Sequence, residues 1–200
     1  MACASSLLSC ALERIDAVHG EDPAREAWEG EMLPRELVYA RRMSAWLERL
    51  RPDASAALRL AVRAQHLRRW EVPRERYPMD RAGYHRWRGV LARRQAETAG
   101  SILREVGYDE TTIARVQALV RKEGLKQDPE TQILEDAACL VFLENYFADF
   151  AARHPEDELL RIVRKTWVKM SPQARDAALA LPLAPPVREL IAKALTPQGP

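Results

Sequence analysis

The sequence predicts an all-α protein, folded as a single-domain bundle of about eight or nine helices. Apolar residues recur at helical spacing in nearly every segment, the chain holds only eight glycines, and most of its thirteen prolines fall between periodic segments. With 200 residues and 47% apolar content, the chain can bury one core of ordinary size. We therefore expect residues 1–200 to form one helical domain.

The helix limits follow from capping residues, glycine and proline. Pro34 suits the first position of the second helix, Asp53 or Ser55 can cap the third, and Gly107 can close the fourth. Asp109 and Ser171 can cap later helices. The expected helices begin and end near 6–18, 34–50, 55–70, 83–106, 109–122, 129–153, 156–169, 172 onward and 185–195.

Charge and cysteine content limit the classes of function. The 31 basic and 29 acidic residues give a formal charge of +2, unlike a nucleic-acid coat protein or a protein of membrane surfaces. Three cysteines without metal-binding or disulfide spacing fit a reducing compartment. No apolar run reaches the length of a membrane span, and the N-terminal segment is predicted to be helical rather than a signal peptide. We expect a soluble, cytoplasmic protein without a membrane partner, in an oligomeric state that the sequence does not indicate.

One histidine stands in a segment that should face the core. His66 follows an alanine- and leucine-rich stretch of the expected third helix, where Arg69 and Trp70 would share its face at i,i+3 and i,i+4. A buried imidazole needs a polar partner. A structural histidine bonded to a carboxylate and a metal ligand both fit this pattern. His19, at the end of the first helix, is expected on the surface or as a cap.

An acidic pair interrupts the most apolar expected helix. Burying Glu135 or Asp136 without a cation or several donors would cost several kcal/mol, so one of them requires a partner. That partner is either an arginine or a divalent metal shared with His66. Glu144 lies two turns beyond Asp136 and can join either arrangement.

An ordered loop rich in arginine and aromatic residues is expected at about 70–83. Residues 59–94 hold eleven basic residues and only three acidic ones. Arginine forks beside aromatic rings suit the recognition of phosphates and bases, so the loop is either a phosphate- or nucleotide-binding feature or a structural lid. The candidate ligand-binding residues are Arg69, Trp70, Arg74, Arg76, Tyr77 and Gln95.

Long strings of the sequence resemble an uncharacterised bacterial and fungal family, domain-of-unknown-function family 4202. They cover nearly the whole chain and include DPARE, ELVYARRMSAWLERLRPDAS, AQHLRRWEVPRERYP, GYHRWR, KQDPETQILEDAACLVFLENYF and KTWVKMS.

The order of elements resembles, more distantly, the HD superfamily of metal-dependent phosphohydrolases. This resemblance implies that AVRAQH matches the first metal-binding helix, with His66 as the first ligand and Asp136 as the final aspartate. The sequence departs from the HD pattern at Leu67, which stands where an aspartate belongs. Gln95 and the Arg121-Lys122 pair occupy positions of later histidines, and Lys122 can pair with Asp136 in place of a metal.

Two functions follow as hypotheses. In the first, an HD-like hydrolase of a phosphorylated small molecule or nucleotide binds Mn, Fe, Co or Zn through His66 and Asp136. Glu135 or Glu144 then orients water, with Lys122 as a further catalytic candidate. In the second, a non-catalytic module binds a nucleotide, RNA or an acidic partner through the arginine and aromatic loop. A purely structural role for all these residues would predict only lost stability on mutation.

Overall fold

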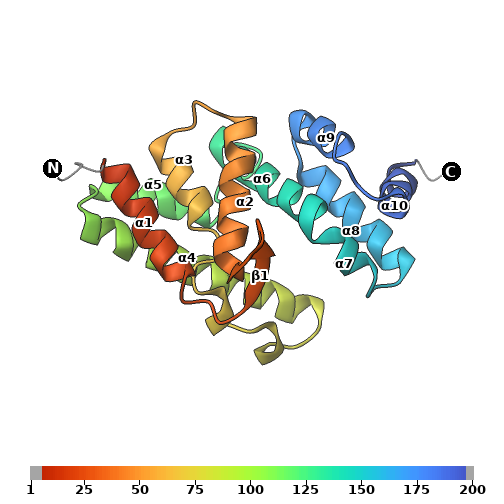
Figure 1. Cartoon of the computed structure of the whole chain (residues 1–200), viewed down its shortest axis with the longest axis horizontal. Helices are drawn as coiled ribbons and strands as arrows, with labels where there is room; N and C mark the ends of the chain where they lie inside the picture. The colour runs from red at the N-terminus through yellow and green to blue at the C-terminus, as the bar shows by residue number, and fades with distance from the viewer. Residues whose placement is uncertain (1–5, 197–200) are drawn as a thin grey trace. The chain divides into compact units, whose positions relative to one another are not determined.

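The computed structural model describes residues 6–196, so Cys3 lies outside the described residues (Figure 1). The chain divides after Gly124 into two compact units, which we call the N-terminal unit and the C-terminal unit. Both units are built almost entirely of helices, which confirms the predicted all-α class. The prediction of a single domain stays a prediction.

In the N-terminal unit, α3 and α4 each pack against more than one other helix. α4 packs against α5 and α1, and α3 packs against α5, α2 and α1. Its elements in chain order are α1 (Leu7–His19), β1 (Arg25–Trp28), β2 (Glu31–Pro34), α2 (Arg35–Leu50), α3 (Ala56–Arg63), the short 3₁₀ turns η1 (Arg69–Glu71) and η2 (Arg74–Arg76), α4 (Arg81–Val106) and α5 (Glu110–Val120).

The C-terminal unit is purely helical in the described range. Within it α6 packs against α9, α7 and α8, and α10 packs against α8 and α7. The elements are α6 (Pro129–Asn145), α7 (Phe147–Ala151), α8 (Glu156–Lys169), α9 (Pro172–Leu179) and α10 (Pro185–Leu195). The sequence predicted one helix from 129 to 153, and this is wrong, because the chain breaks at Tyr146 and restarts as α7.

Side-chain caps fix most of the helix starts. The carboxylate of Asp109 accepts the N–H of Thr112, and the hydroxyl of Ser171 accepts the N–H of Ala174, as the sequence predicts. Ser55, rather than Asp53, caps α3. Gly107 ends α4 with a φ of 101°, a left-handed conformation that a side chain would strain.

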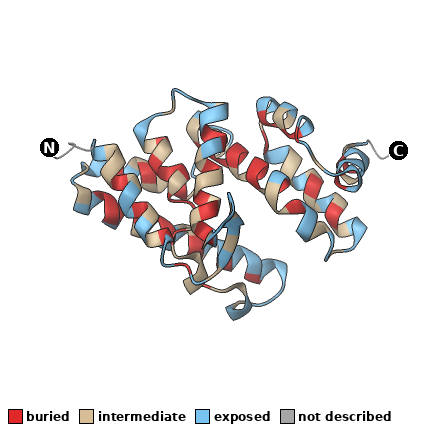
Figure 2. Ribbon diagram, in the orientation of Figure 1, coloured by how far each residue is buried: buried red, intermediate tan, exposed pale blue. Residues whose placement is uncertain are grey.

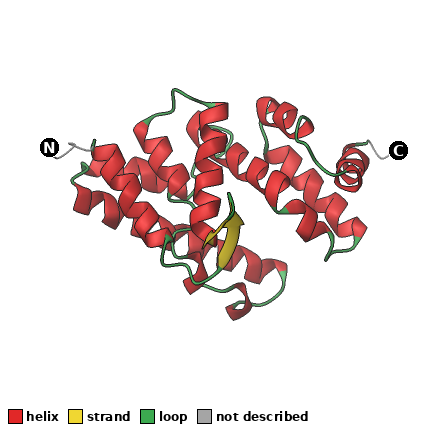
Figure 3. Cartoon of the chain, viewed as in Figure 1, coloured by secondary structure: helices red, strands yellow, loops and turns green. Residues whose placement is uncertain are grey.

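Two local structures differ from the predictions. The third helix ends at Arg63 instead of near residue 70, because His66 and Arg68 adopt left-handed φ values of 69° and 50°. His66 and Trp70 therefore do not share a helical face. A β-hairpin, β1 paired antiparallel with β2, was not predicted because its four-residue strands carry no clear apolar alternation (Figure 3).

Buried residues line the inward sides of the helices in each unit (Figure 2). Most are apolar, and the few buried polar side chains are His19, Asp22, Glu36, Gln65, Gln95, Thr131, Glu135 and Asp136. In the part that the structure describes, no helix combines the length and apolar content that a membrane span requires. The buried polar residues of the N-terminal unit lead to the candidate site.

Candidate functional site: a buried histidine, glutamate and arginine

Glu36 is a carboxylate placed in the core by the first turn of α2. It lies at the helical spacing of the buried residues Ala40, Met43 and Leu47, so it continues their apolar stripe, and it is 5% exposed. Its backbone N–H donates to the carboxylate of Asp22 at 2.9 Å, and Asp22 also accepts the N–H of Ala24. Asp22 thereby fixes the start of α2 and the position of Glu36.

His66 meets Glu36 from the irregular turn after α3. Its left-handed backbone costs about 1 kcal/mol or more, and histidine tolerates this region better than most residues. The turn brings the imidazole Nδ1 to 2.9 Å from Glu36 Oε2. Arg69 completes the arrangement, and we name Glu36, His66 and Arg69 the buried triad, in which Glu36 is buried and His66 and Arg69 are half-buried.

The hydrogen bonds of the buried triad fix the state of the imidazole. The guanidinium of Arg69 can only donate, and its Nη1 lies 2.7 Å from His66 Nε2 and 3.4 Å from Nδ1, so it does not distinguish the two ring nitrogens. The ionised carboxylate of Glu36 can only accept, so Nδ1–H donates to it and Nε2 is unprotonated in the neutral ring. This leaves His66 neutral, oriented by a carboxylate on one side and presenting a lone pair on the other.

The pKa shifts agree with a neutral imidazole. Burial lowers the pKa of His66 well below its ordinary value, and the positive charges of Arg69, Arg88 and Lys122 lower it further. Burial raises the pKa of the Glu36 carboxyl, which Arg69 and Arg35 oppose. Burial also lowers the pKa of Arg69. The positive charges of Arg69, Arg88 and Lys122 therefore lie close enough to act on this site.

Aromatic rings enclose the buried triad. The ring of Tyr39 stacks on His66 with centroids 3.9 Å apart and an interplanar angle of 12°. The guanidinium of Arg69 lies 5.1 Å from the ring centroid of Trp87, within the range of a cation–π interaction. Trp87 is held in turn because its indole N–H donates to the carbonyl oxygen of Val72 at 2.8 Å.

His19 lies near the same site, which overturns its predicted surface position. It is fully buried, and its Nε2 donates to the carbonyl oxygen of Arg63 at 2.9 Å. Its Nδ1 has no hydrogen-bond partner among the described residues. Burial lowers the pKa of His19, and its charge when protonated would act on both Glu36 and His66. A second neutral imidazole thus stands behind the buried triad.

The predicted carboxylates of α6 lie in the C-terminal unit, each with partners there. Asp136 Oδ1 accepts the Ser171 N–H and the Gln132 amide, both at 2.9 Å. Lys169 lies 3.3 Å from Glu135, and Asn145 donates to the exposed Glu144. Asp136 is thus built into the start of α9.

The predicted ligand-binding residues of the loop are held mainly by backbone atoms. Arg74 donates to the carbonyl oxygens of Tyr77 and Asp80, and Arg76 reaches the carbonyl of Glu71 at 3.5 Å. Tyr77 packs against the apolar cluster of Val72, Trp87 and Leu91. The loop is therefore ordered by its own contacts, with Arg69 as its residue in the buried triad.

The three remaining candidates, Gln95, Lys122 and Trp70, lie in different surroundings. Gln95 is 5% exposed, and its amide nitrogen has no partner among the described residues. Lys122 ends α5 with a left-handed φ of 58° and lowers the pKa of His66 through its charge. Trp70 is half-buried within η1.

Sequence reasoning missed Glu36, Asp22 and the burial of His19. Glu36 had a usable signal, since it keeps the spacing of the apolar stripe of α2 and a charge at such a position requires a partner. Asp22 and His19 flank a short turn, and no periodicity marks them. Their roles depend on contacts between α1, α2 and the turn after α3, which no local pattern records.

The donor atoms do not gather into a metal centre in the described part of the chain. No group of three or more histidine, cysteine, aspartate or glutamate side chains has the geometry to hold a metal ion there. His66 Nε2, the atom that would ligate a metal, faces the cation of Arg69. The assignment of a divalent metal to His66 and Asp136 stays a prediction.

The fold and the site define an all-helical protein with a neutral histidine held between a buried glutamate and a buried arginine. The chain belongs to the family described as a domain of unknown function (DUF4202), whose model matches residues 9–191. No curated protein and no solved structure matches the chain.

Proposed function

We propose that the protein is a phosphohydrolase that binds the phosphoryl group of a small molecule or nucleotide at the buried triad. The observation that supports this most directly is the pairing of a neutral, oriented imidazole with a buried guanidinium. One group can accept a proton and the other can bind an anion. These are the two tasks that phosphoester hydrolysis requires of a protein.

The charge around the buried triad favours an anionic ligand. Arg35 and Arg69 act on the carboxylate of Glu36, and Arg88 adds positive charge beside Arg69. A phosphoryl group would compensate this positive charge, and the planar fork of arginine matches its oxygens. Arg69 would then donate its hydrogen bond to a phosphate oxygen in place of His66 Nε2.

The chemical step follows from the same exchange. Once Arg69 binds phosphate, the lone pair of His66 Nε2 is available to accept a proton from an attacking water. The water oxygen bonds to phosphorus, the bond from phosphorus to the ester oxygen breaks, and the leaving oxygen takes up a proton from solvent. His66 then returns its proton to solvent, which restores the neutral imidazole. Glu36 keeps the imidazole oriented and stabilises its protonated form, as a carboxylate does in other histidine-based sites.

The experiment measures release of inorganic phosphate from a panel of sugar phosphates and nucleoside phosphates. Each substrate is tested with no added metal and with Mn, Fe, Co or Zn. His66→Asn is the main variant, because asparagine tolerates the left-handed backbone and can still donate to Glu36 but lacks the Nε2 lone pair. We expect its kcat to fall by about 10²- to 10⁴-fold.

A matched control and a binding readout separate the outcomes. Arg14→Gln removes an exposed arginine whose one partner among the described residues is Glu105, and it should leave phosphate release unchanged. A ligand that binds at Arg69 and raises the melting temperature, but from which no phosphate is released, would favour the second candidate, a non-catalytic nucleotide-binding module. If no phosphorylated ligand is hydrolysed and none raises the melting temperature, both candidates are refuted. Metal analysis of the purified protein and of His66→Asn tests the metal assignment separately.

A further inference from the structure

The exposed face of the first half of α4 is strongly basic. Between Arg81 and Arg94 the helix holds five arginines, and no aspartate or glutamate occurs from residue 81 to 96. Arg81, Arg86 and Arg93 are exposed, as is His85 between them. At 1.5 Å per residue, Arg81 and Arg93 lie about 18 Å apart along the helix axis.

These three arginines differ from others on the same helix. Among the described residues, no hydrogen bond, ion pair or ring contact is made by the side chains of Arg81, Arg86 or Arg93. Arg94 pairs with Glu71, and Arg104 makes two hydrogen bonds to Glu110. Arg94 and Arg104 are thus paired with carboxylates, whereas Arg81, Arg86 and Arg93 have no such partner among the described residues.

The start of α4 carries a cation beside one capping carboxylate, that of Asp80, which accepts the N–H of Gly83 at 2.6 Å. Arg81 lies in the first turn of α4, which contains no acidic residue. The backbone N–H groups of a first turn carry partial positive charge, so a cation there is slightly unfavourable. A ligand with several negative charges would relieve both this repulsion and the repulsion among the guanidiniums.

An exposed aromatic ring, that of Tyr84, lies one helical turn from Arg81 and from Arg88. Tyr84 is 46% exposed, and its ring contacts His85 edge to face with centroids 5.8 Å apart. It is the one large hydrophobic side chain exposed on this helix in the described residues. A face with a single ring offers little to insert into a bilayer, whereas one ring suffices to stack on an unpaired base.

We propose that this face of α4, which we call the arginine face (Arg81, Tyr84, His85, Arg86 and Arg93), binds a single-stranded polynucleotide. The arginines contact phosphodiesters about two to three nucleotides apart, and Tyr84 stacks on an unpaired base. Their span of about 18 Å matches about five nucleotides at 3.4 Å each. The arginine face excludes Arg88, Arg69 and the rest of the buried triad, so the inference does not depend on the proposed hydrolase.

The test is fluorescence anisotropy of the full chain with labelled 20-nucleotide probes. The probes are single-stranded RNA, single-stranded DNA and a duplex, with polyglutamate as an acidic polypeptide competitor. Three phosphate contacts to a single strand predict a logarithmic salt slope of about −2, or about an 18-fold loss of affinity between 50 and 200 mM salt. RNA or DNA preference identifies which strand is the natural ligand.

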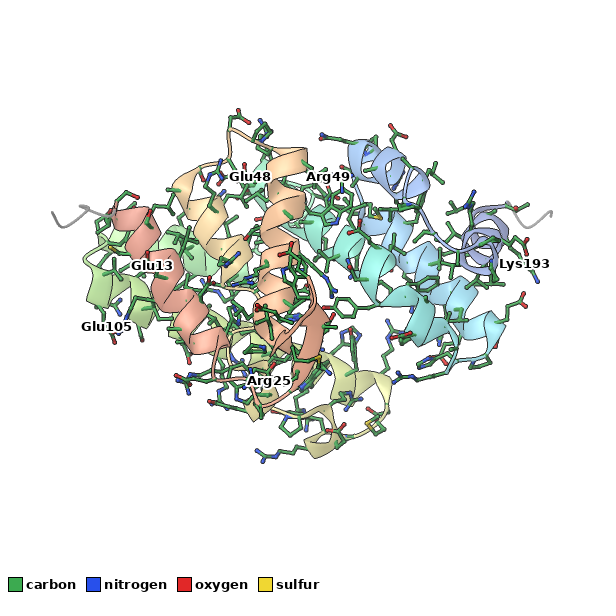
Figure 4. The ribbon with its side chains drawn as sticks, in the orientation of Figure 1. Glu13, Arg25, Glu48, Arg49, Glu105 and Lys193 are labelled. Atoms are coloured by element: carbon green, nitrogen blue, oxygen red, sulfur yellow. The ribbon has the colours of Figure 1, made fainter. Side chains whose placement is uncertain are left out.

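Charge-matched variants locate the binding. The triple variant Arg81→Gln, Arg86→Gln, Arg93→Gln should weaken binding at least tenfold and flatten the salt slope. The control triple Arg14→Gln, Arg104→Gln, Arg121→Gln removes equal charge from exposed ion pairs of the same unit. Figure 4 labels Glu105, the partner of Arg14, near the C-terminal end of α4. This control should bind within about twofold of the unmodified protein.

Tyr84→Ala tests the stacking contribution and should weaken single-strand binding about fivefold or more. Circular dichroism checks that each variant keeps its helices. The inference is overturned if the unmodified protein does not bind single strands, or if the two triple variants bind equally. It is also overturned if duplex or polyglutamate competes as well as the single strand, because binding would then reflect charge alone.

Discussion

Two buried, neutral histidines should make the stability of the N-terminal unit depend on pH. Burial lowers the pKa of His66 and of His19 from the ordinary value of 6.5. A depressed histidine pKa contributes stability that is fully present above 6.5 and is lost as the pH falls toward the folded-state value, because only the unfolded chain binds the proton readily. The stability should therefore decrease on acidification below about neutral pH.

The linkage relation limits the size of the loss. One histidine with an unfolded pKa of 6.5 can remove at most about 1.4 kcal/mol from the unfolding free energy between pH 7.5 and 5.5, and the pair at most about 2.7 kcal/mol. Glu36 acts in the opposite direction. Burial raises its pKa, so its contribution is present at low pH and is lost as the pH rises through the folded-state value.

The variant that tests this is His19→Gln with His66→Asn. Glutamine can keep the hydrogen bond from the His19 Nε2 position to the carbonyl of Arg63, and asparagine can keep the one from the His66 Nδ1 position to Glu36. Neither residue titrates. Urea unfolding followed by tryptophan fluorescence suits this unit, because it holds Trp28, Trp46, Trp70 and Trp87.

The unmodified protein should lose stability from pH 7.5 to 5.5, and the double variant should stay flat or gain slightly. The reasoning is refuted if the unmodified protein shows no loss over this range. It is equally refuted if the double variant loses as much as the unmodified protein, since other groups would then be responsible.

Three further changes test the packing around the sites. Gly83→Ala should cost about 1–3 kcal/mol in thermal unfolding, because a Cβ would collide with the carbonyl oxygen of Pro78. Gly89→Ala, on the open side of the same helix, should instead stabilise by about 0.5–1 kcal/mol, and a loss there would contradict the assigned exposure. Asp136→Ala should destabilise the C-terminal unit by about 1–3 kcal/mol, because the Ser171 N–H loses its acceptor, and urea unfolding followed by circular dichroism that shows no change would reject this role.

Local signals in the sequence predicted most of the fold. Asp109 and Ser171 cap their helices, and Gly107 closes α4, because each of these acts through its own backbone neighbourhood. The early end of α3 had no such signal. The turn that follows it brings His66 to Glu36, thirty positions away in the sequence, and helical periodicity does not record a contact of that range.

In the candidate site too, local sequence patterns mark some residues, and others are recognised only from contacts between distant parts of the chain. A histidine in an apolar segment was enough to select His66, and the neighbouring arginine selected Arg69. The partner was sought in the most apolar helix, at Glu135 and Asp136, because the cost of a buried charge is highest there. Glu36 meets the same criterion in a less apolar helix, since it occupies the stripe of Ala40 and Met43.

A charged residue in phase with an apolar stripe is therefore a stronger indicator of a buried site than a charged residue in an apolar helix. In the first case the helix must turn the charge toward the core, whatever the composition of its other face. In the second, the charge can still reach solvent or the end of a neighbouring helix, as Glu135 does by pairing with the half-exposed Lys169. Extended from charged to neutral polar residues, the criterion selects Gln95 in α4, which continues the buried line of Trp87 and Leu91 and whose amide nitrogen has no partner among the described residues.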